Sequence, residues 1–157
     1  MSKPDNKCYL MSDLSSINEE LIPLKEIADR ELVSIHGLTG MVYTPHLDAY
    51  MKVCIKKAAI LTSLKNQEIL PLSTVEKISS ILDSLHKKVR NHTIVEYNGN
   101  NYERRFSPLK LSKSGKNVRS WAKFWLLKLP DGKVDPNWES QVREIWPAYF
   151  LIRTINY

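Results

Sequence analysis

Cationic and aromatic side chains alternate along the segment 118–129. Every second residue of a β-strand faces the same side, so one side of this segment is apolar and the other interleaves cations with indole rings. The mixed side suits nucleic acid, because Lys and Arg neutralise phosphates and an exposed aromatic ring stacks on a base. The alternative is a core face over which the lysines extend their apolar stems. The apolar side holds Val118, Ala122, Phe124 and Leu126, and the mixed side holds Arg119, Trp121, Lys123 and Trp125.

Positive charge is concentrated around this segment. The chain of 157 residues carries a net charge of +6, but residues 1–78 sum to −1 and residues 79–157 to +7. Within 87–128, eleven Lys and Arg face only Glu96 and Glu103. Such a run predicts a surface that contacts DNA or RNA phosphates, with Gly115 letting the backbone approach a phosphate closely. The predicted phosphate contacts are Arg104, Arg105, Lys110, Lys113, Lys116, Arg119 and Lys123, with Trp121 as the stacking residue.

Helical patterns fill the half of the chain that precedes these residues. We predict a short helix over 14–22, a second that begins at Pro23 and ends before Gly37, and a third over 45–65 with Thr44 as its N-cap. Ser73 and Glu76 have the spacing of a capping box, which starts a helix that we extend to about residue 90. Its last turn would hold Lys87, Lys88 and Arg90. We expect these amphipathic helices to pack on one another.

Near Asn91 the hydrophobic period changes from 3.6 to about 2, which predicts strands. Asn98-Gly99 favours a type I′ turn between strands at 93–97 and 100–106. A third strand follows at 118–129, and Asp135-Pro136 starts a short helix to about residue 146. Segments 7–11 and 148–157 are candidates for further edge strands. The predicted fold is α+β, with a lead-in over 1–12, a helical half over 13–91 and a basic, strand-rich half over 92–157. We expect the helical half to pack with a three- to four-stranded antiparallel sheet and the short helix in one cooperative domain.

Two resemblances point to nucleic acid as well. Arg30 and His36 are separated by five residues. This segment resembles the Arg-x(4–6)-His motif of HEPN-type RNases. That resemblance implies His36 as the acid/base group and Arg30 as the stabiliser of the phosphate transition state. A sheet followed by a helix is also similar in architecture to small three-stranded domains that place a sheet in the DNA major groove. We favour a non-enzymatic binding or regulatory protein over the RNase.

Several other classes of function lack their signals. Two cysteines, Cys8 and Cys54, are too few for a disulfide scaffold or a cysteine zinc site, and the four histidines show no metal-ligand spacing, so we expect no metal and no cofactor. No stretch has the roughly 18 apolar residues of a membrane span, and the start lacks a signal-peptide core, so we expect a cytoplasmic protein. A module that docks on an acidic protein partner remains the main alternative. The oligomeric state stays open.

Overall fold

The computed structural model describes residues 8–38 and 43–152. The chain forms two compact units, Met1–Pro71 and Leu72–Tyr157, which we call the helical unit and the sheet unit. Helices precede a three-stranded antiparallel sheet, so the predicted α+β class is confirmed. The first unit ends before the third helix, twenty residues ahead of the change in period at residue 91. That the two halves unfold as one cooperative domain stays a prediction.

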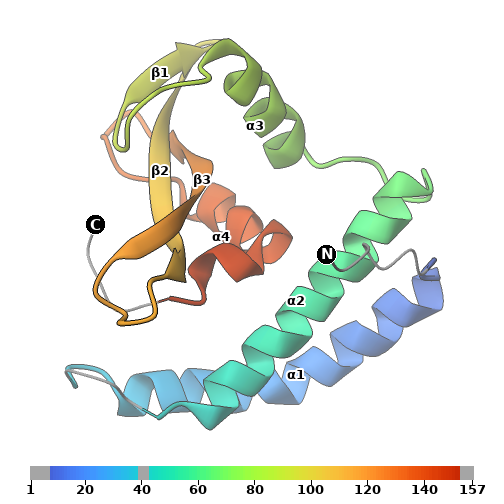
Figure 1. The fold of residues 1–157 in the computed structure, drawn as a ribbon. Coiled ribbons are helices and arrows are strands. Elements are labelled where there is room, and N and C mark those ends of the chain that lie inside the picture. The colour runs from blue at the N-terminus through green and yellow to red at the C-terminus, as the bar shows by residue number, and fades with distance from the viewer. Residues whose placement is uncertain (1–7, 39–42, 153–157) are drawn as a thin grey trace. The chain divides into compact units, whose positions relative to one another are not determined.

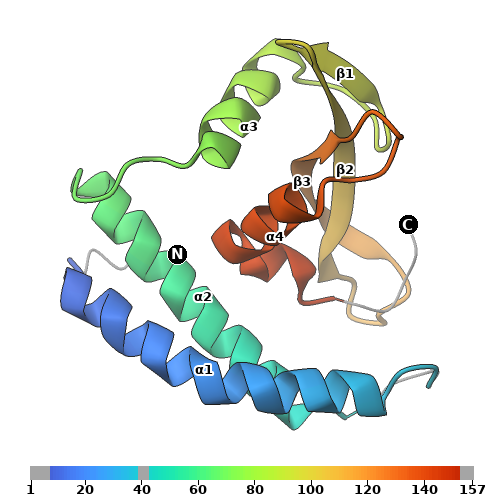
Figure 2. The same ribbon diagram turned by 180° about the vertical axis from the view of Figure 1, so that it is seen from behind.

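The helical unit is a pair of antiparallel helices, α1 (Met11–Ser34) and α2 (Pro45–Asn66), which lie side by side in both views (Figure 1, Figure 2). Its core is small, with Ile17 of α1 packed on Ile60 and Leu64 of α2. The prediction of Pro45 as the first residue of α2 is confirmed. The carboxylate of Glu31 in α1 accepts hydrogen bonds from the backbone N–H groups of His46 and Leu47, at 3.3 and 3.0 Å. These N–H groups at the start of α2 have no partner within their own helix, so Glu31 caps it.

The predicted break at Pro23 is wrong, because α1 runs through this residue without interruption. Pro23 has no N–H to donate to the carbonyl four residues earlier, so the helix lacks one internal hydrogen bond there. Burial on both sides of the proline compensates. Ile17 before it is 2% exposed and Ala28 after it is 0% exposed, so packing outweighs the local preference of proline for a first turn.

The sheet unit begins with α3 (Thr74–Leu85) and continues with β1 (Ile94–Tyr97), β2 (Asn100–Leu111), β3 (Val118–Lys128), α4 (Pro136–Ile145) and a 3-10 turn, η1 (Pro147–Phe150). The sheet order is β1-β2-β3, and α4 lies against β3 (Figure 1). The predicted hairpin is confirmed: Tyr97 pairs with Asn100, and Asn98 and Gly99 take φ values of +51° and +82°, as a type I′ turn requires.

The core of the sheet unit contains α3, so this helix of the predicted helical half packs with the sheet. Val75 and Leu82 of α3 belong to one buried cluster with Tyr102 of β2 and Trp125 of β3. An amphipathic face fits any apolar surface of suitable width, so periodicity alone did not identify the partner of α3. The remaining buried members of this cluster are Phe124, Leu126, Trp138 and Val142.

Three boundaries also differ from expectation. Helix α3 ends at Leu85, so the basic residues at 87, 88 and 90 follow the helix and lie exposed in the connection to β1. Within this connection, Val89 packs against the sheet core. No strand forms at described residues 8–11, since α1 begins at Met11, and Pro147–Phe150 is a 3-10 turn rather than a strand. The rest of the candidate strands, residues 7 and 153–157, lies outside the described residues.

The capping box at the start of α3 is confirmed and leads to a stability prediction. The Ser73 hydroxyl accepts the N–H of Glu76 at 3.2 Å, and the Glu76 carboxylate accepts the N–H of Ser73 at 3.2 Å. Ser73→Ala should therefore lower the free energy of unfolding by about 1 kcal/mol, measured by urea denaturation followed by circular dichroism. Ser80→Ala, at an exposed position inside α3, is the control and should change stability much less. Equal losses in both variants would contradict the capping role.

Candidate nucleic-acid interface

The hairpin between β2 and β3 carries most of the predicted contacts, and backbone bonds define its loop. Ser112 and Asn117 close the loop through an N–H to carbonyl bond of 2.8 Å, and the N–H of Gly115 donates to the carbonyl of Ser112 at 2.9 Å. Gly115 has a φ of +73°, a conformation that residues with a Cβ rarely adopt. The pairing of β2 with β3 also shifts register between Pro108 and Leu111, as in a β-bulge. The sequence therefore builds a defined loop that projects lysines from a twisted strand end.

Five of the predicted cations are exposed on this hairpin, and among residues 8–38 and 43–152 none of them forms an ion pair. Close, unpaired like charges repel one another, so this arrangement costs stability unless a counter-charge binds. We call these five residues and Trp121 the hairpin surface. The five cations are Lys110, Lys113, Lys116, Arg119 and Lys123.

Arg104 does not belong to that surface. It is 6% exposed, and its guanidinium Nη1 donates to Asp83 Oδ1 at 2.9 Å. The guanidinium carbon also lies 4.7 Å from the ring centre of Trp125, whose Nε1 donates to the same Asp83 oxygen at 2.9 Å. Arg104 is thus a structural residue that joins β2 to α3, which removes it from the set of phosphate contacts that we propose.

The expected mixed face of the third strand is correct only in its first half. Arg119, Trp121 and Lys123 are exposed, whereas Trp125 is 1% exposed. The three consecutive residues 124–126 are all buried, so both faces of β3 are covered at this end. Alternation distinguishes an inner from an outer face only where one face meets water, and it fails where the protein covers both.

Arg105 lies in a different cluster, around the carboxylate of Glu103. This carboxylate is buried, with its side chain 9% exposed, and Arg105 Nη1 lies 3.2 Å from Oε1. Lys128 Nζ approaches the same oxygen at 3.9 Å, and His92 Nδ1 lies 3.5 Å from Oε2. A buried carboxylate needs such partners to offset its desolvation. The charge of Arg105 is therefore balanced within the fold, although its side chain remains 37% exposed.

Arg30 and His36 are both exposed near the end of α1, and no hydrogen bond or ion pair joins these two described residues. Arg30 instead pairs with Glu26 one turn earlier. Glu31, which lies inside the motif, caps the start of α2. The structure thus gives two residues of this segment a role in the fold of the helical unit. It does not bring Arg30 and His36 together.

Two tyrosines of the sheet unit have a raised side-chain pKa. Burial raises the pKa of Tyr102, and burial also raises the pKa of Tyr149, with Asp83 adding to the effect and Arg104 opposing it. Both hydroxyls therefore stay protonated at neutral pH. Neither tyrosine lies on the hairpin surface, so these shifts concern the core.

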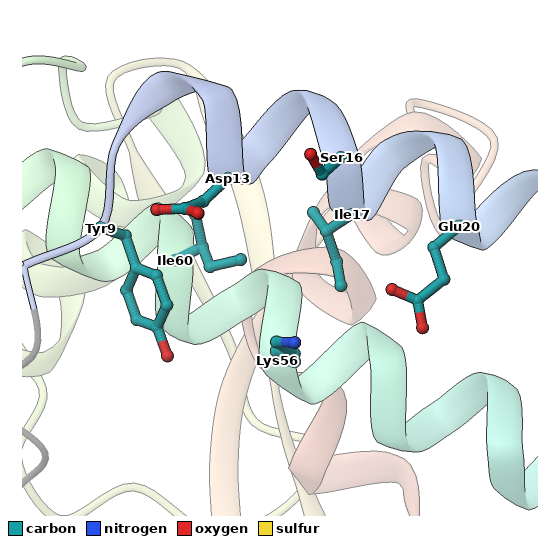
Figure 3. Close-up of a pocket in the computed structure, with 7 residues that line it drawn as sticks. All are labelled: Tyr9, Asp13, Ser16, Ile17, Glu20, Lys56 and Ile60. Carbon is teal, nitrogen blue, oxygen red and sulfur yellow. The ribbon is translucent and has the colours of Figure 1, made fainter.

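A small pocket lies between α1 and α2 in the helical unit (Figure 3). Asp13 and Glu20 of α1 and Lys56 of α2 line it, and its volume is about 120 Å³. Small-molecule sites usually span roughly 300–1,000 Å³, so this pocket is too small to hold such a ligand.

Among the described residues, no group of three or more His, Cys, Asp or Glu is placed to hold a metal ion. In the same residues, no helix is long and apolar enough to cross a membrane.

Comparisons with protein-family models, with curated proteins and with solved structures give no match to this chain. The two acidic residues that decide the roles of Arg104 and Arg105, Asp83 and Glu103, were not singled out from the sequence. Asp83 sits on α3, 21 positions before its arginine, and no local pattern signals a pair at that separation.

Proposed function

We propose that this protein binds DNA or RNA through the hairpin surface, without catalysing a reaction. The observation that supports this most is a set of five exposed cations on one defined hairpin, none of which forms an ion pair with another residue that the structure describes. Phosphates supply the counter-charge that the fold does not provide, and their binding releases condensed counterions from the nucleic acid. The exposed thiol of Cys8 is compatible with a reducing compartment, and we place the protein in the cytoplasm.

The direct test is fluorescence anisotropy with random-sequence duplex DNA, single-stranded DNA and RNA at about 50 and 200 mM salt. Five phosphate contacts on a duplex give a log–log salt slope of about −4.5, so affinity should fall about 500-fold between the two concentrations. Absence of binding at the lower salt concentration would contradict the proposal. The acidic-protein alternative would then be examined by a pull-down.

Replacing Arg119 and Lys123 together with alanine should weaken binding at least tenfold at about 100 mM salt and reduce the magnitude of the slope by about 1.8 on duplex DNA. Both side chains are exposed, so the melting temperature should hardly change. The control is Lys25→Ala with Lys52→Ala, which removes the same charge from exposed positions of α1 and α2. If the control weakens binding as much as the hairpin variant, net charge rather than this surface is responsible.

A further inference from the structure

Four residues form a block on one face of the sheet, next to the cationic loop. Phe106 lies opposite Lys123 in the β2–β3 pairing, and Pro108 lies opposite Trp121. Directly opposed residues of an antiparallel pair share a face, and so do residues two apart on one strand. This block therefore places two aromatic rings and one ammonium group together on the strands that lead into the loop.

The two rings of the block have different roles. The ammonium of Lys123 lies 5.1 Å from the ring centre of Phe106, so a cation occupies the face of that ring. Phe106 is half-buried, and its ring centre lies 6.5 Å from that of Trp121, with the rings tilted by 44°. Phe106 thus supports the indole from one side. Trp121 itself is 37% exposed, so part of its ring surface is accessible to a ligand.

Trp125, the other tryptophan of β3, is an indole buried in the core and serves as a comparison for Trp121. Trp125 lies four residues later, is 1% exposed, and has its N–H bonded to Asp83 and a guanidinium over its ring. Trp121 also has an aromatic neighbour, Phe106, but its side chain is 37% exposed. Only a ligand with an accessible flat face gains from such a ring, and the bases of a duplex already stack on one another.

We propose that the hairpin surface prefers single-stranded nucleic acid, with an unpaired base stacked on Trp121 and the neighbouring phosphates held by Lys123 and the loop lysines. This inference rests on the proposed function and adds the class of nucleic acid to it. Phosphate contacts alone do not select single strands, because both forms carry them. The preference arises from the indole, so it should be separable from the salt dependence.

The test compares anisotropy titrations of single-stranded DNA, single-stranded RNA and duplex DNA of one matched sequence. Wild type should bind a single strand more tightly than the duplex. Trp121→Ala should weaken single-strand binding about tenfold, within the range for one stacked base, should weaken duplex binding much less, and should keep the salt slope, which depends on the phosphate contacts. Trp121→Phe keeps a ring and should retain most of the affinity. The DNA and RNA titrations show which strand chemistry is preferred.

Tryptophan fluorescence supplies a second readout. Trp125 and Trp138 are buried, and the half-buried Trp146 stacks on Tyr149 outside the β2–β3 pairing, so quenching on single-strand binding should come mainly from Trp121 and should be largely lost in Trp121→Phe. Thermal melts of both variants check that they fold. Equal weakening of single-strand and duplex binding in Trp121→Ala, or a duplex affinity as high as that of the single strand, would overturn this inference while leaving the proposed function intact. Absence of salt-sensitive binding to every nucleic acid would overturn the proposed function itself.

Discussion

Replacing Trp125 with alanine is expected to lower the free energy of unfolding of the sheet unit by about 3–5 kcal/mol. The indole is among the largest fully buried side chains of the described residues, at 1% exposed, so its removal leaves a cavity among Leu82, Tyr102 and Trp138. It also removes the 2.9 Å hydrogen bond to Asp83. Urea denaturation followed by circular dichroism measures the loss.

Trp121→Ala is the matched control, since it removes the same side chain from the same strand. Trp121 is 37% exposed, so its loss should cost much less stability than that of Trp125. If Trp125→Ala fails to fold, Trp125→Phe keeps an aromatic ring and loses the indole N–H, and its smaller cost should still be measurable. Equal effects of alanine at the two positions would contradict the difference in burial on which our choice of Trp121 depends.

Asp83→Ala should cost about 3 kcal/mol, because it leaves the buried guanidinium of Arg104 without its carboxylate. The side chain of Arg104 is 8% exposed while that of Asp83 is 55% exposed, so the two partners are not equivalent. Arg104→Met removes the buried charge and leaves a carboxylate that water can reach. That variant should cost about 1 kcal/mol, since an apolar side chain of similar length can replace a buried ion.

The double variant Asp83→Ala with Arg104→Met should be more stable than Asp83→Ala alone, because it no longer buries an unpaired charge. Urea denaturation of the two single variants and the double variant completes the cycle. A cost for Arg104→Met equal to that for Asp83→Ala would show that the guanidinium contributes more through packing on Trp125 than through its charge. Nucleic-acid affinity should follow stability rather than the loss of Arg104 itself, because Arg104 lies outside the hairpin surface.

Local chemistry made several features of the fold predictable. Asn98-Gly99 accepts the positive φ values of a tight hairpin, and Ser73 with Glu76 satisfies the open N–H groups of a helix start. Asp135 caps α4 at 2.9 Å, as its position before Pro136 indicated. Each of these depends on residues within a few positions of one another. The α+β class followed from the same local signals, because a period of 3.6 gives way to a period of 2 once along the chain.

One part of the candidate site followed from composition and position. The loop lysines Lys113 and Lys116 are exposed, because a polar loop with glycine and serine offers no apolar surface on which to bury them. Arg104 and Arg105 carry the same charge as those residues but differ in their partners. Whether a cation is paired depends on carboxylates that are distant in the sequence.

By itself, then, the sequence determined the α+β class, the start of α3, the turn between β1 and β2, and the cationic character of the second hairpin. Only the tertiary structure decided that α3 packs on the sheet, that Pro23 stays within one helix, and that Trp125 is buried while Trp121 is exposed. The physical reason is the range of the interactions. Caps and turns are satisfied within a few residues, whereas burial depends on which surfaces meet, and Asp83 reaches Trp125 across 42 positions of the chain.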